Sequence, residues 1–249
     1  MIRAAVHVHS DWSFDGSWPL AELVVELRRR GYGAVLTAEH DRGFDDERWL
    51  SYREACAAAS DAAGIPVVAG IEYSDPENVV HVPAWGEDLP FLGEARPTAE
   101  LIEEVAAAGG AAMLAHPGRR KAWARVDADS LARLVGIEVW NRKYDGWAPG
   151  ALASNLCAAN EGVVPFFGLD FHTSRQFFPL AMGIDAGLTA TPAEVVGALL
   201  ERRCRPLAFG MAGERFMRGA GFGATRAAER SRRMLRPAVR RVRAARSGA

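Results

Sequence analysis

Two histidines separated by one residue follow an apolar run near the start of the chain, in the segment HVHSDWSFDG at residues 7–16. In a β-strand, positions i and i+2 share a face, so we expect His7 and His9 to point the same way. Their imidazoles can then bind one metal ion, and imidazole with carboxylate ligands suits zinc, manganese or iron. Asp15 and Gly16 predict a turn that brings a further carboxylate to the same region.

The other histidines and three carboxylates follow a common pattern. Five of the six histidines, all but His81, lie at or just beyond the C-terminal end of an apolar segment that we predict to be a strand. Asp15, Glu72 and Asp170 follow such ends too. In a barrel of parallel strands these ends meet on one face, where catalytic groups sit. A single histidine of this kind is more often an ordinary hydrogen-bonded or exposed residue, but the shared pattern favours a site. The expected metal ligands are His7, His9, Asp15, His40, Glu72, His81, His116, Asp170 and His172.

Short apolar segments alternate with helical patterns along the chain. Strands are predicted at residues 3–9, 34–38, 67–71, 79–85, 111–115, 136–140, 164–169 and 206–209. Helices are predicted at residues 19–30, 46–62, 98–108, 129–134, 149–160 and 192–203. This alternation is typical of a parallel sheet with helical crossovers, closed or nearly closed into a barrel. An open doubly wound sheet is the alternative, and no GxGxxG motif follows the first strand to support a dinucleotide-binding fold.

Composition indicates one globular domain followed by a basic extension. The chain has 249 residues, 49% of them hydrophobic, and a net charge of −1. Residues 214–249 contain eleven arginines and two glutamates, whereas the rest contains 19 basic and 29 acidic residues. We therefore assign residues 1–212 to the barrel and 213–249 to an Arg- and Ala-rich extension. Three separated cysteines, no signal-peptide pattern and no membrane-length apolar segment predict a soluble cytoplasmic protein.

The extension allows three interpretations. It contains an apolar stripe at helical spacing, formed by Met234, Leu235, Ala238, Val239 and Val242. The stripe predicts a helix that packs on the barrel or on a partner, although Pro237 is expected to break or kink it. Alternatively, the arginines bind nucleic acid or an anionic membrane surface, or the segment is disordered.

Five motifs in order resemble the PHP (polymerase and histidinol phosphatase) phosphoesterases. HVHSDWSFDG resembles their first motif, HxHSxxSxDG, and TAEH at residues 37–40 resembles the second, which is usually TDH. GIEYS (70–74), AHPGR (115–119) and GLDFH (168–172) resemble the segment with a bridging glutamate, the HP motif and the usual GSDAH. The matches span roughly residues 1–185. The resemblance implies a distorted (β/α)7 barrel of the TIM type, with two or three divalent metals at its C-terminal face.

The resemblance also implies a role for each ligand. His7, His9, Glu72 and Asp170 would bind the first metal; Glu72, His81 and His116 the second; and Asp15, His40 and His172 the third. Glu72 would bridge two metals. Two residues depart from the family pattern: Glu39 replaces an aspartate, which is expected to change a contact behind the ligands, and Leu169 replaces a small residue, which is expected to reshape the pocket wall.

The expected activity is hydrolysis of a phosphomonoester or nucleotide by a metal-activated hydroxide, with catalytic roles for Asp15, Glu72, Asp170 and Arg119. Arginine suits phosphate, so Arg119, Arg175 and Arg142 are the predicted phosphate-binding residues. Lys143 is interpreted as a surface charge. The expected partner is a small phosphorylated substrate, with nucleic acid as a further partner through the basic extension.

Three other functions remain open. The first is a nuclease of the same family that trims oligonucleotides, with the extension holding the strand. The second is an amidohydrolase, against which stands the absence of any lysine between Arg3 and Arg120 that could be carbamylated. The third is a non-catalytic scaffold, which would be expected to have lost ligands.

Overall fold

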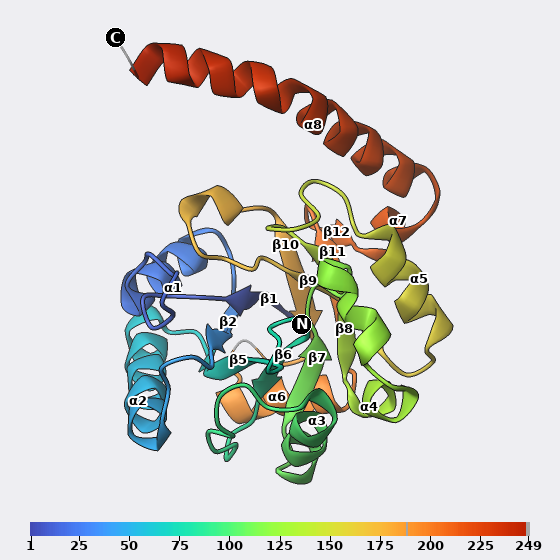
Figure 1. The fold of residues 1–249 in the computed structure, drawn as a ribbon. Coiled ribbons are helices and arrows are strands. Elements are labelled where there is room, and N and C mark those ends of the chain that lie inside the picture. The colour runs from blue at the N-terminus through green and yellow to red at the C-terminus, as the bar shows by residue number, and fades with distance from the viewer. Residues whose placement is uncertain (188, 248–249) are drawn as a thin grey trace.

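The computed structural model describes residues 1–187 and 189–247, with side chains described as far as residue 237 in the last helix. It is a mixed α/β fold in which helices surround two sheets (Figure 1). The strands are β1 (Ile2–Val8), β2 (Ala34–Thr37), β3 (Glu39–His40), β4 (Val67–Val68), β5 (Gly70–Ser74), β6 (His81–Trp85), β7 (Ala111–Leu114), β8 (Gly136–Asn141), β9 (Val164–Gly168), β10 (Leu180–Ile184), β11 (Cys204–Ala208) and β12 (Met211–Ala212). The α-helices are α1 (Leu20–Arg29), α2 (Asp46–Ala63), α3 (Thr98–Ala107), α4 (Ala128–Arg133), α5 (Ala151–Ala159), α6 (Pro192–Leu200), α7 (Glu214–Met217) and α8 (Gly219–Ser247), with 3-10 turns at η1 (Arg119–Arg125) and η2 (Ser174–Gln176).

The two sheets have six strands each, in the orders β12-β11-β10-β1-β2-β4 and β3-β5-β6-β7-β8-β9. The chain passes from the first sheet to the second between β2 and β3, and again between β4 and β5. The segment after β9 lies beside β1, because the amide of Leu169 donates to Val6 O at 3.0 Å and that of Phe171 to His7 O at 3.1 Å. The two sheets are therefore joined on one side by the chain between β2 and β3 and between β4 and β5, and on the other by hydrogen bonds between β1 and the segment after β9.

The expectation of an all-parallel sheet is wrong at two places. β6 runs antiparallel to β5 and β7, because the connection over residues 75–80 is too short for the crossover that a parallel strand needs. β10 was not predicted, and it pairs antiparallel with β1 and β11. The remaining pairs of the described sheets, β11 with β12 apart, are parallel.

All six predicted helices are confirmed within three residues at each end. Local capping explains several ends. The side chain of Asp45 accepts from the amide of Arg48 at the start of α2, and Gly64 ends that helix in the left-handed region. Thr191 and Glu194 form a capping box at the start of α6.

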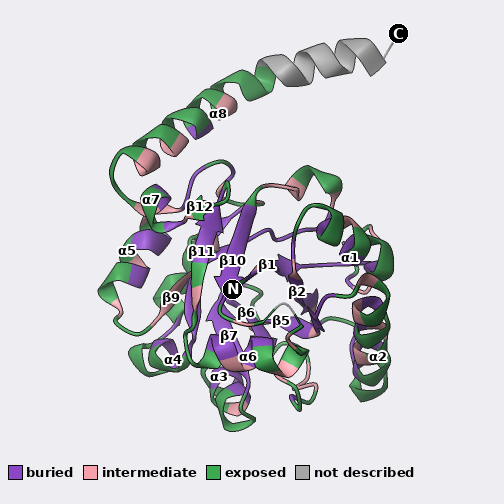
Figure 2. Cartoon of the chain, turned by 180° about the vertical axis from the view of Figure 1, so that it is seen from behind, coloured by how far each residue is buried: buried purple, intermediate pink, exposed green. Residues whose placement is uncertain are grey.

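The strands form the buried core of the molecule, and the helices expose one face to solvent (Figure 2). β7 and β8 are buried along their whole length, as expected for strands covered on both faces. Leu169 is buried in this hydrophobic core rather than in a pocket wall, so the effect predicted for it is not observed.

The basic extension forms α7 and the long helix α8, which runs across one end of the fold (Figure 1). Pro237 lies inside α8, so the predicted break does not occur. Met234 and Leu235 are 74% and 61% exposed, so this part of the apolar stripe does not pack on the body of the protein. The side chains of Ala238, Val239 and Val242 lie outside the described residues. Among the described residues, no helix combines the length and apolar character needed to span a membrane.

Candidate metal centre

Glu72 lies at the centre of a cluster of histidines. Its side chain projects from β5 and is 1% exposed. Histidine nitrogens surround both of its carboxylate oxygens: His81 Nδ1 at 3.0 Å, His7 Nε2, His116 Nε2 and His40 Nδ1 at 3.1 Å, and His9 Nε2 at 3.6 Å. One buried carboxylate is thus shared by five imidazoles, as the predicted bridging position requires.

Two aspartates complete the cluster. Asp170 Oδ1 lies 3.2 Å from His172 Nδ1 and 3.6 Å from His9 Nε2. Asp15 lies between two rings, with its oxygens 3.3 Å from His40 Nε2 and 3.1 Å from His172 Nε2. The structure therefore brings all nine predicted ligands together.

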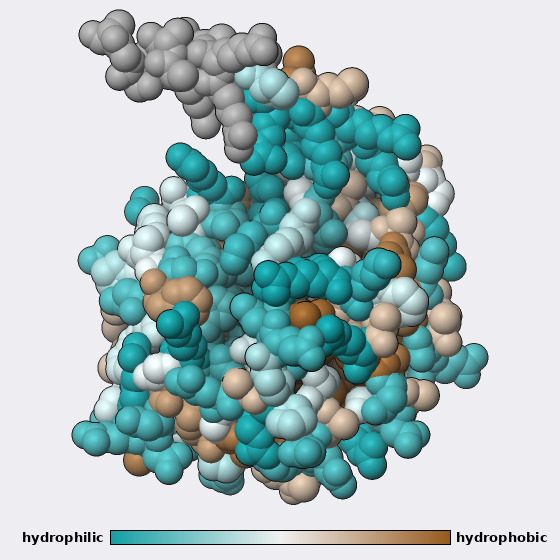
Figure 3. Space-filling view, viewed as in Figure 1, coloured by the Kyte–Doolittle hydropathy of each residue, from teal (hydrophilic) through white to brown (hydrophobic). Residues whose placement is uncertain are grey.

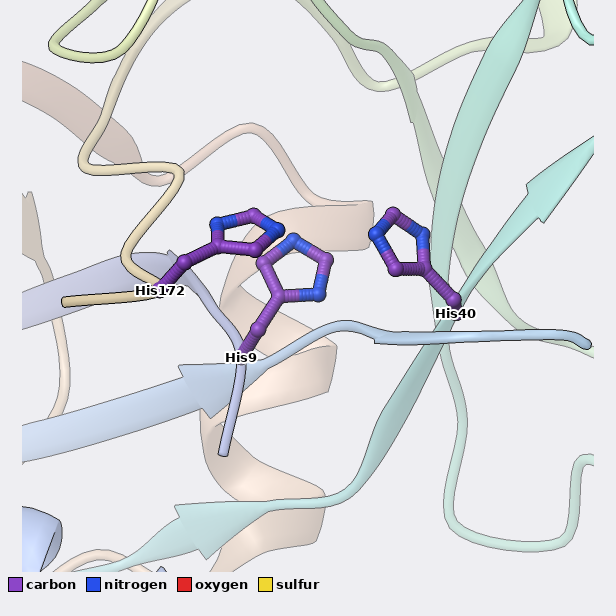
Figure 4. A group of neighbouring side chains, drawn as sticks. All are labelled: His9, His40 and His172. Carbon is purple, nitrogen blue, oxygen red and sulfur yellow. The ribbon is translucent and has the colours of Figure 1, made fainter. Parts of the chain in front are cut away.

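The ligand atoms form four overlapping groups, each compact enough to hold one ion. The groups are His7, His9 and Glu72; His7, His116 and Asp170; Glu72, His81 and His116; and His9, His40 and His172. The group of Glu72, His81 and His116 is the same as the set predicted for the second metal. The group of His9, His40 and His172 differs from the set predicted for the third metal, because it contains His9 in place of Asp15. Figure 4 shows these three rings, which come from the end of β3 and from the segments that follow β1 and β9, and which face a common space.

The backbone is strained where it presents three of these ligands. His7, His116 and Asp170 have positive φ values of 62°, 27° and 45°. Residues other than glycine rarely adopt this conformation, and such strain concentrates at functional sites. At His7 the pairing of β1 with β2 shifts register, so His7 and His9 do not follow the regular alternation from which their common face was predicted. Their rings nevertheless lie 5.1 Å apart.

His81 was the exception to the strand-end pattern, and the topology explains its position. Because β6 is antiparallel, its first residue lies at the same edge as the last residues of its neighbours. His81 pairs with Ser74 at the end of β5, which places its ring beside Glu72.

Carboxylates control the protonation of two ligands. Burial lowers the pKa of His7, but Glu138 and Glu72 together raise it well above the usual value. Burial likewise opposes protonation of His40, but Asp15 and Glu72 raise its pKa to about 10. In the absence of metal, both rings are therefore protonated at neutral pH.

The donor atoms fit a divalent metal. His7 Nδ1 donates to Glu138 Oε1 at 2.9 Å, which leaves Nε2 directed at the cluster. His9 Nδ1 lies 3.3 Å from Ser13 Oγ, which in turn donates to Glu39. Nε2 of His7 and of His9 is buried and has no hydrogen-bond partner among the described residues. A metal-binding histidine characteristically donates its other ring nitrogen to a second group in this way.

Glu39 lies behind the ligands and binds residues that contact them. It is fully buried and accepts from the amide and hydroxyl of Ser10 and from the hydroxyl of Ser13. Ser13 also accepts from the amide of His40 at 3.0 Å. Although glutamate replaces the aspartate of the family pattern here, it still contacts the ligand region, through Ser13.

Sequence analysis missed Glu138 and Asn141. Glu138 is buried in β8, and besides His7 it binds the amide of His116 at 2.8 Å and Asn141 Nδ2 at 2.7 Å. Asn141 also donates to Asp170 Oδ2 at 3.2 Å. Any side chain at Gly168 would collide with Glu138. The available signal was a glutamate in the apolar strand GIEVWN.

Lys143 is exposed, as expected of a surface charge, but it also lies at the edge of the cluster. Its Nζ lies 3.5 Å from Asp170 Oδ1 and 3.1 Å from His172 Nε2. Burial lowers its pKa, but the nearby Asp170 carboxylate gives a net increase, so Lys143 is a cation at the centre.

The three predicted phosphate-binding arginines separate into two places. Arg119 lies at the cluster, where one guanidinium nitrogen is 3.1 Å from His81 Nε2 and donates to Asn78 O at 2.8 Å. Arg142 and Arg175 instead line a neighbouring groove beneath α8. Only Arg119 is thus in reach of the predicted ligands.

Metal affinity should depend on pH because metal binding must displace protons. The His40 proton stabilises the metal-free fold fully below pH 6.5, and this contribution is lost as pH rises towards 10. Removing metal should therefore leave a chain whose Tm falls from pH 6.5 to 9. Manganese affinity should rise over the same range, by up to about tenfold per pH unit for each proton released. Competition titrations with a chelator at several pH values would measure it, and a pH-independent affinity would contradict the assignment of His40.

Comparisons with known proteins agree with this geometry at the level of the fold. No protein-family model matches the sequence, and no curated protein sequence does. Among solved structures, a two-domain protein from Bacteroides vulgatus, described as containing a proposed PHP-like metal-dependent phosphoesterase, aligns over 83% of this chain with 19% identity and a TM-score of 0.60. The chain shares the fold of the PHP-like phosphoesterases.

A second structure supports the same fold. It is a proposed metal-dependent phosphoesterase from Bifidobacterium adolescentis, which aligns over 80% of this chain and 96% of its own, with 19% identity and a TM-score of 0.53. The Bacteroides protein is longer, and the alignment covers 64% of its length. The resemblance to PHP-like proteins stated from the motifs is confirmed as a likeness of fold.

Proposed function

We propose that this chain is a metal-dependent phosphoesterase that hydrolyses a phosphomonoester or a nucleotide. The observation that carries the proposal is the buried carboxylate of Glu72 among five imidazoles. Two of these, His7 and His9, direct toward it a ring nitrogen that makes no hydrogen bond with any described residue. No other arrangement in the described residues combines so many metal-binding side chains.

We infer a distorted (β/α)7 barrel as the scaffold. β2 with β3, and β4 with β5, each form one interrupted strand, and the segment after β9 closes the ring against β1. In this interpretation residues 1–212 form the barrel and β10–β12 extend the sheet at β1. Residues 213–249 are the basic extension.

The nine clustered residues would hold two or three ions of zinc, manganese or iron. When bound, such ions lower the pKa of water and neutralise charge on phosphoester oxygens. The chain itself positions the ligands. Glu138 orients His7, Asn141 holds Asp170, and Ser13 links His9 to Glu39.

The cationic side chains would bind the phosphate. Arg119 and Lys143 both line a cleft of about 340 Å³ whose other walls include Asp15, His40 and His81. A cleft of this size suits a small phosphorylated molecule. Catalytic roles follow for Asp15, Glu72 and Asp170 as ligands, and for Arg119 as the group that binds the phosphate oxygens. No side chain is needed as a nucleophile.

The alternative of a non-catalytic scaffold predicts lost ligands, and all nine positions carry a suitable side chain. An oligonucleotide substrate stays open because basic residues line the groove beside the cleft. An oligonucleotide differs from a small phosphomonoester in its length and in the charge that it carries beyond the phosphate that is cleaved.

The test is turnover by the full chain after loading with manganese or zinc. The panel would contain p-nitrophenyl phosphate, thymidine 5′-monophosphate and a short single-stranded oligonucleotide. We expect turnover of at least one of them that a chelator abolishes and added metal restores. Turnover insensitive to chelation, or a metal-loaded chain inert to all three, would contradict the proposal.

A further inference from the structure

A groove of about 910 Å³ lies between α8 and the loops that follow β8 and β9. In Figure 1, α8 passes over this end of the molecule, and Figure 3 shows that hydrophilic side chains dominate the face below it. Five cationic side chains line the groove, and no carboxylate does; they are Arg142, Lys143, Arg175, Arg232 and Arg236. Such a concentration of one charge attracts anions.

Three of these arginines have no hydrogen-bonding partner among the described residues. Arg142, Arg175 and Arg236 make no side-chain hydrogen bond or ion pair with any described residue, and the Nε atom of Arg142 is buried without a partner. Arg232 differs, because both of its nitrogens bind Glu229. Arg175 and Arg236 are exposed, and Arg142 packs over the ring of Phe178 at 5.0 Å. Because none of the three guanidinium groups donates a hydrogen bond to a described residue, their donors are available to the oxygens of a bound anion.

The groove and the metal centre share a wall. Lys143 lines both the groove and the 340 Å³ cleft, and its Nζ is 3.1 Å from His172 Nε2. Arg175 follows His172 by three residues and lies in the short turn η2. An anion in the groove and a phosphate at the metal centre can therefore belong to one molecule.

The position of α8 is fixed by a specific contact. Glu229 on α8 is 6% exposed and accepts from the amide of Trp147 at 3.0 Å. Gly146 permits this approach, because a Cβ atom there would lie 2.5 Å from Glu229 Oε2. The helix is thus held against the loop after β8 by a buried carboxylate, which places Arg236 over the groove.

We propose that Arg142, Arg175 and Arg236 form a second phosphate-binding subsite, and that the substrate carries a phosphate there in addition to the one at the metal centre. The inference rests on the proposed function and narrows its substrate to molecules with at least two phosphates. A small bisphosphate and a phosphodiester strand share this chemistry. Arginine is suited to it, since its planar fork binds two phosphate oxygens at once.

The test compares binding of three probes to the full chain as purified, without added metal. The probes are thymidine 5′-monophosphate, thymidine 3′,5′-bisphosphate and a 5′-phosphorylated thymidine tetramer. We expect the second phosphate to increase affinity by about tenfold or more. Arg236→Ala or Arg175→Ala should remove most of that gain. A gain with the bisphosphate would identify a small molecule, and a gain with the tetramer alone would identify a strand.

Arg230→Ala is the matched control, because Arg230 lies on the same helix but lines a different pocket. It removes the same charge and should change the gain less than about twofold, well below the loss of one charged hydrogen bond. An equal effect of Arg230→Ala, or an unchanged gain in both groove variants, would overturn the subsite.

Hydrolysis by the same samples after manganese loading separates this inference from the proposed function. If no probe is hydrolysed but the groove variants lose the gain in affinity, the function fails and the subsite stands. If the monophosphate is hydrolysed and the groove variants keep the gain, the subsite fails and the function stands.

Discussion

Replacing Glu72 with glutamine is expected to lower metal-dependent hydrolysis by more than about 10²-fold, since loss of a group that merely supports a ligand already costs 10–100-fold. Glu72 is the only carboxylate that contacts five histidines among the described residues. Nearby histidines hold its pKa well below the usual value despite burial, so it is ionised and able to bind metal. Glutamine keeps the shape but removes the charge. Metal content should fall with activity.

The matched control is Glu103→Gln, an exposed position on α3. It should leave metal content and turnover unchanged. The Tm of both variants in chelator should be compared with that of the wild type, since removing one partner of a buried charged group can destabilise the fold. A folded Glu72→Gln chain with full metal content and turnover would refute the central position of Glu72.

Replacing Glu138 with glutamine should weaken metal binding by about 10- to 100-fold, the range found for groups that support metal ligands. Glu138 does not face the metal cluster directly. It fixes the ring of His7 through Nδ1 and the backbone of His116 through its amide. Loss of its charge should lower the pKa of His7 and leave its ring less well oriented.

A merely structural role would change the Tm of the metal-free chain without changing metal affinity once the chain is folded. The decisive reading is therefore the affinity for manganese, measured by chelator competition well below the Tm of the variant. Glu138→Asp, which keeps the charge but shortens the reach, should bind metal more tightly than Glu138→Gln. Equal affinity in Glu138→Gln and wild type would show that Glu138 does not position His7.

Much of the site was predictable because ligands follow strands in the sequence. Apolar runs ending in histidine identified β1, β2 and β7, and the parallel-strand rule placed their ends on one face. This logic was sufficient for His40 and His116. The strand predicted at residues 67–71 is divided into β4 and β5, and Glu72 lies within β5 rather than beyond a strand end. His7 was also correctly expected in the cluster, but the stated reason was incomplete. Its ring is directed by a positive φ and a register shift rather than by strand alternation.

The remaining features depend on contacts between distant residues. The short connection before β6 makes that strand antiparallel to β5. Only the pairing of the two strands shows that this direction places His81 beside Ser74 at the end of β5. Glu138 and Lys143 carry no distinguishing local pattern, since one lies in an apolar strand and the other beside an arginine. Only the contacts of Glu138 with His7, and of Lys143 in the loop after β8 with Asp170, reveal that both lie at the centre.

The extension illustrates the same limit. Its apolar stripe suggested packing through Met234 and Leu235, but both are exposed and the described contact is made by Glu229. A lone glutamate in an arginine-rich helix looks like a solvated charge. Its burial against Gly146 and Trp147 is a property of the folded chain.

The most direct test of the account is the number of metal ions bound per chain. Wild type and His9→Ala would be dialysed against manganese or zinc, and their metal content measured by mass spectrometry. His9 belongs to two of the four compact ligand groups, and burial together with the neighbouring His40 and His172 lowers its pKa, so its ring is neutral and ready to bind. We predict two or three ions per wild-type chain and at least one fewer in folded His9→Ala. A wild-type chain that binds none, or a His9→Ala chain with full metal content, would contradict the metal centre.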